Sequence, residues 1–187
     1  MKKRILSIVL CLVMVFSMLP FTASAASAIP INEETFPDPV FREYVLKIVG
    51  SSVLTEEKAQ QIEVLDVSDD NIKEVLGKRD PITSLMGIRY LRYVKDLNCS
   101  GQELKKTLNL EQNSRVEKLN CSGNQLTGLW FHKGSSLKYL TCSVNEFTAL
   151  DLSKCSELIE LSCGSNKLTS LDLSANTKLQ KISAGSN

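Results

Sequence analysis

The 187-residue sequence contains a single histidine, His132, and only 6% of its residues are aromatic. A cysteine–histidine nucleophilic pair needs the imidazole within hydrogen-bonding reach of the thiol. His132 lies in the stretch LWFHKGSS, away from the expected strand cysteines, and is interpreted as a surface residue. The sequence also lacks a glycine-rich phosphate loop, paired catalytic carboxylates and an H-E-x-x-H motif. We therefore expect no catalytic residues; a thiol enzyme would need an exposed cysteine of low pKa.

Neither sign of charge is in excess, with 22 Lys and Arg against 21 Asp and Glu. Residues 1–25 contain three of the Lys and Arg residues and no Asp or Glu, so the chain without this segment has 19 Lys and Arg against 21 Asp and Glu. Nucleic-acid binding requires a clustered excess of Lys and Arg, and no nucleic-acid partner is expected. The cysteines also lack the close pairing along the chain that structural zinc sites use. We expect no metal and no cofactor.

The apolar run at the start of the chain, residues 5–19, is shorter than the ~20 residues of a membrane-spanning helix. Three cations precede it, and Ala23-Ser24-Ala25 follow it. A charged start, a short apolar middle and small residues at the end are typical of a secretory signal peptide. We expect cleavage after Ala25, a secreted protein, and no membrane span after cleavage.

Cysteines recur in the remainder of the chain at a fixed period. Cys99, Cys121, Cys142 and Cys163 are separated by 22, 21 and 21 residues. Each lies in the same pattern, L-x-x-L-x-C-x-x-N-x-L followed by T-x-L-D-L-S, as in LIELSCGSNKL. An earlier copy, IEVLDVSDDNI, starts at residue 62, and the start of another, LQKISAGSN, closes the chain. This period predicts a stack of repeats rather than a disulfide framework.

These repeats resemble those of leucine-rich repeat proteins, of the secreted or surface-attached bacterial kind with internalin-like architecture. The resemblance covers residues 62–187. It implies a leucine-rich repeat solenoid with short parallel β-strands on its concave face. Because a 21-residue unit leaves about ten residues for the return segment, we expect extended or 3-10 convex segments rather than helices.

The L-x-L-x-C core of each repeat predicts two inward columns along the strands. One is Leu97, Leu119, Leu140, Leu161 and Ile182, and the other is the cysteine column, in which sulfur acts as a small apolar group. A third column, Asn124, Asn145, Asn166 and Asn187, is expected to satisfy backbone groups of the turns. Asp70 and Gln102 replace asparagine in the first two repeats, which predicts a weaker ladder there. Cys155 lies outside the column, in a connecting loop, and is expected to be partly exposed.

Residues 26–61 are predicted to form a small helical N-terminal cap on the repeats. Asp38 and Pro39 start an amphipathic helix that Gly50 ends, and a shorter helix is expected near residues 56–61. The segment FPDPVFREY resembles the cap motif of similar secreted proteins. The following VGSSVLTEE lacks the alternate carboxylates of a calcium loop. The first repeat is enlarged by an insertion near residues 73–81, which we expect to bulge out of the stack.

Outward strand residues form the candidate ligand-binding surface. Among the outward-pointing strand residues, Tyr139 is the aromatic one, and aromatic side chains are favoured as binding hot spots. The predicted contact residues are Lys118, Asn120, Tyr139, Thr141 and Glu160. The alternative is that this face is a solvated scaffold. Trp130 stands where other repeats have an exposed acid and could mark a second, apolar contact on the back.

The predicted function is a secreted, non-catalytic recognition or adhesion module that binds protein or cell-envelope ligands. The alternative is the targeting or substrate-binding region of a larger secreted enzyme, with its catalytic domain beyond the C-terminus. The sequence stops at Asn187, in the middle of a repeat. We therefore expect a longer natural form, which could be attached to the cell surface.

Overall fold

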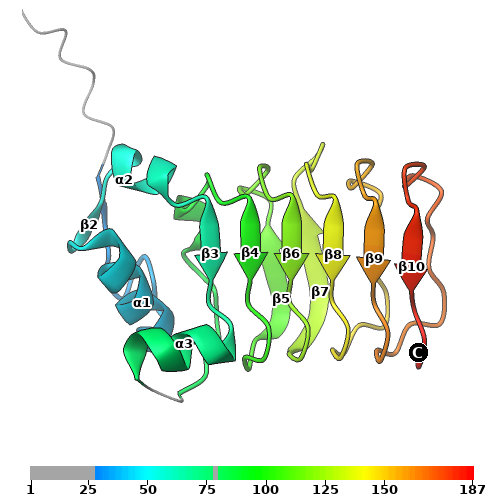
Figure 1. Cartoon of the computed structure of the whole chain (residues 1–187), viewed down its shortest axis with the longest axis horizontal. Helices are drawn as coiled ribbons and strands as arrows, with labels where there is room; N and C mark the ends of the chain where they lie inside the picture. Colours follow the sequence, from blue (N-terminus) through cyan, green and yellow to red (C-terminus); the bar gives the residue numbers. More distant parts are fainter. Residues whose placement is uncertain (1–27, 78–79) are drawn as a thin grey trace, which may run out of the picture.

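In the part of the chain that the structure describes, three short helices gather at one end of a stack of parallel strands (Figure 1). The structure is a computed structural model, and it describes residues 28–77 and 80–187. The expected signal peptide, residues 1–25, lies outside the described residues. Within the described ranges, none of the helices has the length and apolar character needed to cross a membrane.

Six of the described strands form one parallel sheet with a three-residue strand from each repeat. The strands are β3 (Val64–Asp66), β4 (Asp96–Asn98), β6 (Lys118–Asn120), β8 (Tyr139–Thr141), β9 (Glu160–Ser162) and β10 (Lys181–Ser183). They pair in chain order, and the central residue of each strand lies opposite that of the next. The predicted leucine-rich repeat solenoid of parallel strands is confirmed.

Two inward columns make the core of the stack, because alternate strand residues point to the same side. Along the leucine column, exposure is 2% or less from Leu65 to Leu161, but Ile182 is 52% exposed since no described strand lies beyond β10. In the second column, Val67 and the four repeat cysteines are fully buried, and every cysteine in the described ranges is free. Burial of one such leucine stabilises the fold by about 1.5–3 kcal/mol.

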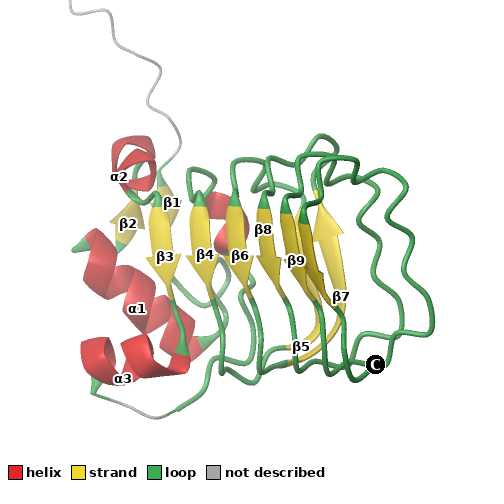
Figure 2. Cartoon of the chain, turned by 45° about the vertical axis from the view of Figure 1, so that its right-hand side comes forward, coloured by secondary structure: helices red, strands yellow, loops and turns green. Residues whose placement is uncertain are grey.

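The return segments of the repeats lie behind the six-stranded sheet (Figure 2). Two of them, β5 (Lys105–Leu110) and β7 (Gln125–Phe131), form a separate two-stranded parallel sheet. The return segment of the first repeat contains a 3-10 turn, η1 (Ile88–Tyr90). The predicted extended or 3-10 character of these segments is confirmed.

The helical N-terminal part lies against β3 and begins with α1 (Pro39–Val49) (Figure 1). The Asp38 carboxylate caps α1 by accepting hydrogen bonds from the backbone N–H groups of Val40 and Phe41, and Gly50 ends the helix with φ of 66°. A two-stranded antiparallel ribbon, β1 (Ile29–Pro30) and β2 (Val53–Leu54), connects to α2 (Glu56–Gln61). The expected helical N-terminal part is confirmed.

A third helix, α3 (Asp69–Leu76), follows β3 within the enlarged first repeat. The sequence interpretation treated this region as a bulge and gave no helix. Asp69 in the first turn and Lys73 one turn later form an ion pair, Ile72 is buried, and Gly77 ends the helix with φ of 67°. The Asn71 amide of α3 donates to the Tyr44 hydroxyl of α1 at 3.3 Å, so α3 packs beside the first helix.

Buried side-chain amides join each repeat to the preceding one. The amide oxygen of Asn124 accepts from the Leu104 N–H at 3.0 Å, and its nitrogen donates to the carbonyls of Cys99 at 2.9 Å and Cys121 at 3.1 Å. The same set of bonds recurs at Asn145, Asn166 and Asn187. Each amide therefore satisfies backbone groups in its own repeat and in the one before it.

The predicted weakening of this ladder at its N-terminal end is confirmed in part, because Gln102 bonds to the preceding repeat but, unlike Asn124, donates to no described carbonyl of its own repeat. Its side chain is 5% exposed, accepts from the Ile82 N–H at 2.7 Å and donates to the Val67 carbonyl at 2.9 Å. Glutamine therefore supplies the donor and acceptor that asparagine supplies in the later repeats. Asp70 takes no part in the ladder, because its side chain points into solvent from the first turn of α3.

The prediction of a partly exposed Cys155 is wrong, because the side chain is fully buried. Cys155 occupies the position that Asn176 takes one repeat later, and that position points into the stack rather than out of the loop. Asn176 donates to the Cys155 carbonyl at 2.7 Å. Burial raises the pKa of the Cys155 thiol to about 11.

Candidate ligand-binding surfaces

The outward side of the six-stranded sheet, here called the strand face, brings the five predicted contact residues together. Register pairing places Lys118, Tyr139 and Glu160 side by side on β6, β8 and β9, and it places Asn120 opposite Thr141. Tyr139 is 37% exposed. The buried leucine and cysteine columns lie directly beneath, so these side chains project from a well-packed support.

Charges on the strand face are paired between neighbouring strands. Lys118 lies 3.6 Å from the Asp96 carboxylate, and Lys181 lies 2.7 Å from the Glu160 carboxylate. The hydrogen bond from Lys181 to Glu160 raises the pKa of that lysine. Tyr139 stands between these two ion pairs, so the charged side chains on the described strands beside it, Lys118 and Glu160, are both paired. Such a face suits a partner recognised by polar and aromatic contacts more than one recognised by a strong field.

Asn98 and Asn120 use only half of their hydrogen-bonding capacity. Each amide oxygen accepts from the N–H and the hydroxyl of the serine two residues later, Ser100 or Ser122. No described residue accepts a hydrogen bond from either amide nitrogen. These turns therefore fix the side chains with their donors outward, an arrangement that the spacing of the repeats alone did not predict.

The cysteine column does not have the properties of a reactive site. Burial raises the pKa of Cys99 to about 12 and also raises the pKa values of Cys121, Cys142 and Cys163. A nucleophilic thiol requires the opposite shift and an accessible sulfur. His132 is exposed after the end of β7. Within residues 28–77 and 80–187, no cluster of three or more His, Cys, Asp or Glu is placed to hold a metal ion.

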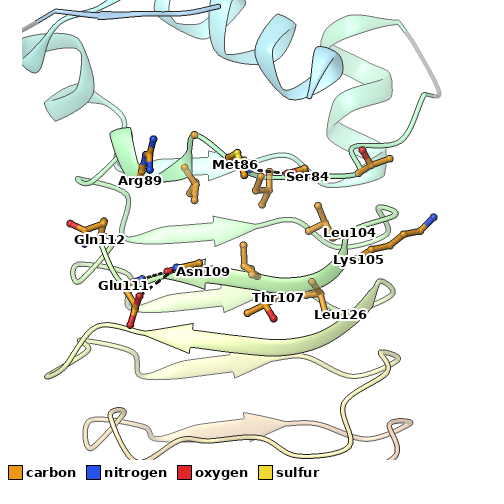
Figure 3. Close-up of a pocket in the computed structure, with 15 residues that line it drawn as sticks. Ser84, Met86, Arg89, Leu104, Lys105, Thr107, Asn109, Glu111, Gln112 and Leu126 are labelled. Carbon is orange, nitrogen blue, oxygen red and sulfur yellow. Dashed lines mark hydrogen bonds between the residues drawn. The ribbon is translucent and has the colours of Figure 1, made fainter. Parts of the chain in front are cut away.

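A second candidate surface lies behind the sheet, between residues 83–89 and β5 (Figure 3). This cavity, here called the β5 groove, has a volume of about 370 Å³. Leu104, Leu108 and Leu126 supply apolar lining, while Arg89 and Lys105 supply charge. Met86 projects at its upper side and is 62% exposed.

The N-terminal part fixes residues 83–87, which form one side of the groove. The second oxygen of the Asp38 carboxylate accepts from the Thr83 N–H at 2.8 Å, the Thr83 hydroxyl at 2.9 Å and the Ser84 N–H at 3.2 Å. Gly87 has φ of 107°, and a Cβ at this position would lie 2.5 Å from the Phe36 ring. This close approach requires glycine and fixes the segment against Phe36.

Sequence reasoning missed the β5 groove for a physical reason. Residues 82–85, ITSL, repeat the LTGL, FTAL and LTSL of the later repeats, but residues 86–89 depart from the pattern that follows there. The contact that fixes this segment joins it to Asp38, 45 residues away. Asp38 was recognised as a helix cap, but its second role leaves no mark in the local sequence.

Trp130 is the exposed aromatic residue on the back of the stack. It lies on β7, is 55% exposed and sits opposite Asn109 of β5. The next residue, Phe131, is 3% exposed and belongs to the core, as expected. Trp130 does not line the β5 groove. Its contact role therefore stays a prediction.

Comparison with known proteins finds solved structures of similar fold. No protein-family model matches the chain, and no curated protein matches it. Among solved structures, the functional domain of InlJ from Listeria monocytogenes, described as including a cysteine ladder, superimposes with a TM-score of 0.69 at 28% identity. The match covers 87% of this chain and 34% of that structure, so the chain spans about a third of its length.

Two other solved internalins of Listeria monocytogenes are more distant. The chain matches InlF with a TM-score of 0.41 and InlC2 with a TM-score of 0.34, both at 17% identity. The matches cover 86% of this chain and 59% of InlF, and 84% of this chain and 97% of InlC2. The likeness to InlJ, together with the parallel strands and stacked cysteines, shows a leucine-rich repeat solenoid of internalin-like architecture.

Proposed function

We propose that this leucine-rich repeat chain is a secreted, non-catalytic recognition or adhesion module that binds a protein or cell-envelope ligand on the strand face. The observation that carries the proposal is the register of three adjacent strands, which aligns Lys118, Tyr139 and Glu160 above the buried core. The extracellular location rests on the signal-peptide pattern of residues 1–25.

Tyr139 is the expected anchor of this surface. It offers a rigid ring with a hydroxyl at its tip, and partly exposed tyrosines at interface centres carry a large share of binding energy. The outward amide nitrogens of Asn98 and Asn120 and the hydroxyl of Thr141 add hydrogen-bonding groups beside it. The paired charges around the ring keep it free of a single-sign field.

The test uses an array of purified extracellular proteins and an array of cell-envelope glycans as probes. We expect Tyr139→Ala to weaken binding to any ligand found by about tenfold or more. Trp130→Ala is the matched control, because it removes an exposed aromatic residue from the opposite side of the stack. Equal binding by wild type and Tyr139→Ala, or loss only in Trp130→Ala, would refute the proposal.

A further inference from the structure

The β5 groove is a gap between two chain segments that hydrogen bonds join only at its ends. At one end the Glu103 N–H donates to the Ile82 carbonyl at 3.1 Å. At the other, the side-chain amide of Asn113 donates to the Ile88 carbonyl at 3.0 Å. Between these closures, no hydrogen bond among the described residues joins residues 83–87 to β5. The same two end bonds recur between later return segments, as at Lys167 and Asn176, so what distinguishes this gap is its cavity and its lining residues.

One edge of β5 faces this gap without a strand partner. Strand β5 pairs with β7 on its other side, and the sheet that they form has no third strand among the described residues. In a parallel pair, alternate backbone N–H and C=O groups point toward the partner and the others point away. The outward groups of β5 can therefore accept an added strand, which is a common way to bind an extended peptide.

The backbone of β5 is locally irregular beside the groove. Its register with β7 shifts between Lys106 and Thr107, and Lys106 has φ of 63°, in the left-handed region. Such bulges turn side chains away from the regular ladder and are enriched near functional sites. The first three residues of β5, Lys105–Thr107, are exposed, whereas Leu104 before them and Leu108 after them are buried, so a bound peptide would meet both polar and apolar surface.

The charge of the groove selects the kind of peptide. Arg89 and Lys105 are exposed lining residues, and no described carboxylate forms an ion pair with either. The Arg89 guanidinium donates to the Tyr90 hydroxyl at 2.9 Å and lies 4.8 Å from the centre of the Tyr90 ring. The acidic lining residue, Glu111, lies 3.7 Å from Lys154 and is thereby compensated. The groove consequently presents two uncompensated cations beside an open strand edge.

We infer that the β5 groove binds a short extended segment of a partner protein that carries acidic side chains. The segment adds a strand to β5 through alternate backbone hydrogen bonds, and its carboxylates pair with Arg89 and Lys105. This site is independent of the strand face, because β5 lies behind the six-stranded sheet (Figure 2). Binding here would give the molecule two surfaces for two partners.

The test selects peptides from a phage-displayed library of random nine-residue sequences on the wild-type protein. Enriched peptides are expected to combine Asp or Glu with β-branched or aromatic residues, and they are then synthesised for affinity measurements by fluorescence anisotropy. Arg89→Glu and Lys105→Glu should each weaken binding by about three- to tenfold. Lys133→Glu is the matched control, since Lys133 is exposed, forms no ion pair with a described residue and lies outside the groove.

Backbone pairing is tested by methylating alternate amide nitrogens of a selected peptide. Two peptides are compared, one methylated at the odd-numbered amides and the other at the even-numbered amides. If the peptide adds a strand to β5, methylation of one set abolishes binding and methylation of the other leaves it nearly unchanged, because only every second amide faces β5. Tyr139→Ala should bind the peptides as wild type does, which separates this site from the strand face. The inference fails if the library yields no enriched peptide, if both charge reversals bind like Lys133→Glu, or if both methylation patterns are tolerated.

Discussion

At the scale of single residues, the repeat cysteines act as small apolar groups in a tight inward column. Val67 fills the equivalent position of the first repeat without sulfur, and it is as fully buried as Cys99. Burial disfavours the thiolate because the charged form would lose its hydration. The column therefore contributes packing and remains protonated at neutral pH.

We expect all five cysteines of the described chain to be inert to iodoacetamide in the native state and to react in denaturant. The reason is that each is fully buried, including Cys155. Intact mass after alkylation, with and without denaturant, measures the number of modified thiols. Modification of the native protein at any of the five would contradict the burial described above.

The raised pKa of Cys99 predicts a loss of stability at alkaline pH that can be assigned to this thiol. In the unfolded chain the thiol ionises near its ordinary value of 9.0, whereas in the folded protein it does so only near about 12. The contribution of Cys99 to the free energy of unfolding is therefore complete below pH 9 and decreases above it. Because the unfolded state alone loses this proton, that contribution should fall by about 1.4 kcal/mol per pH unit between pH 9 and 11, and the other buried thiols add losses of their own.

Cys99→Val is the matched variant for this measurement, because valine occupies the same column at Val67 and cannot ionise. Urea unfolding in the presence of reductant gives the free energy of unfolding at each pH. The difference between wild type and variant should be constant below pH 9 and should shift toward the variant above it. A difference that is independent of pH would show that the folded thiol ionises normally.

Inward and outward strand positions should differ sharply on truncation. Leu140→Ala leaves a cavity beneath β8 and is expected to lower the free energy of unfolding by about 2–5 kcal/mol. Tyr139→Ala, the adjacent outward residue, should leave it within about 1 kcal/mol. Urea unfolding of both variants measures the contrast. Similar losses would mean that the two positions share the core.

Residue-scale periodicity was enough to predict which side chains point inward. The leucine column, the cysteine column and the asparagine ladder follow from one repeated pattern. The burial of Cys155 and the bonds of Gln102 to the preceding repeat were not predicted, because the surroundings of both residues depend on a neighbouring repeat. A single repeat read alone does not show whether a longer amide can reach those groups or whether a loop position points into the stack.

At the scale of elements, one carboxylate connects the first helix to the first repeat. Asp38 caps α1 with one oxygen and holds residues 83–84 with the other. The helix and its caps were predictable, because N-cap and C-cap residues are local signals. The contact with residues 83–84 and helix α3 were not, since both depend on how the enlarged first repeat packs against α1.

Gly87→Ala should destabilise the junction between the helical part and the stack. A methyl group there would lie 2.5 Å from Phe36 and 2.6 Å from the Thr35 carbonyl, and φ of 107° is unfavourable for alanine. Gly134→Ala is the control, because Gly134 also has positive φ but open space around it. We expect a loss of about 2–4 kcal/mol for the first and about 1 kcal/mol for the second in urea unfolding. Equal losses would show that the Phe36 ring can move aside without lowering the free energy of unfolding.

At the scale of the whole molecule, stability is distributed along one axis. Each repeat contacts the repeats on either side of it, so the energy of the stack is approximately a sum of units and their interfaces. Strand β10 has one neighbour, β9, whereas β6 lies between β4 and β8. The overall architecture was predictable because repetition multiplies a weak local pattern into a strong one.

Hydrogen exchange should reveal this gradient at matched positions. The Lys118 N–H donates to the Lys95 carbonyl at 3.0 Å, and the Lys181 N–H donates to the Ile159 carbonyl at 3.2 Å. Despite this equivalence, in a protein produced as residues 26–187 we expect the Lys181 amide to be at least about a hundredfold less protected, because local opening of β10 then breaks only its interface with β9. The measurement uses a dilute sample shown to be monomeric by sedimentation. Equal protection would contradict the one-dimensional description.

The direction of the amide ladder makes each repeat depend on the repeat that follows it in the chain. Asn124 bonds to Leu104 and Cys99, and Asn145 bonds to Leu126 and Cys121, so each amide completes residues made earlier. A repeat is complete only when the next one, 21 residues later along the chain, is in place. Loss of the last repeat therefore leaves backbone groups of the repeat before it without their amide partner, so damage at the C-terminal side passes backward along the stack.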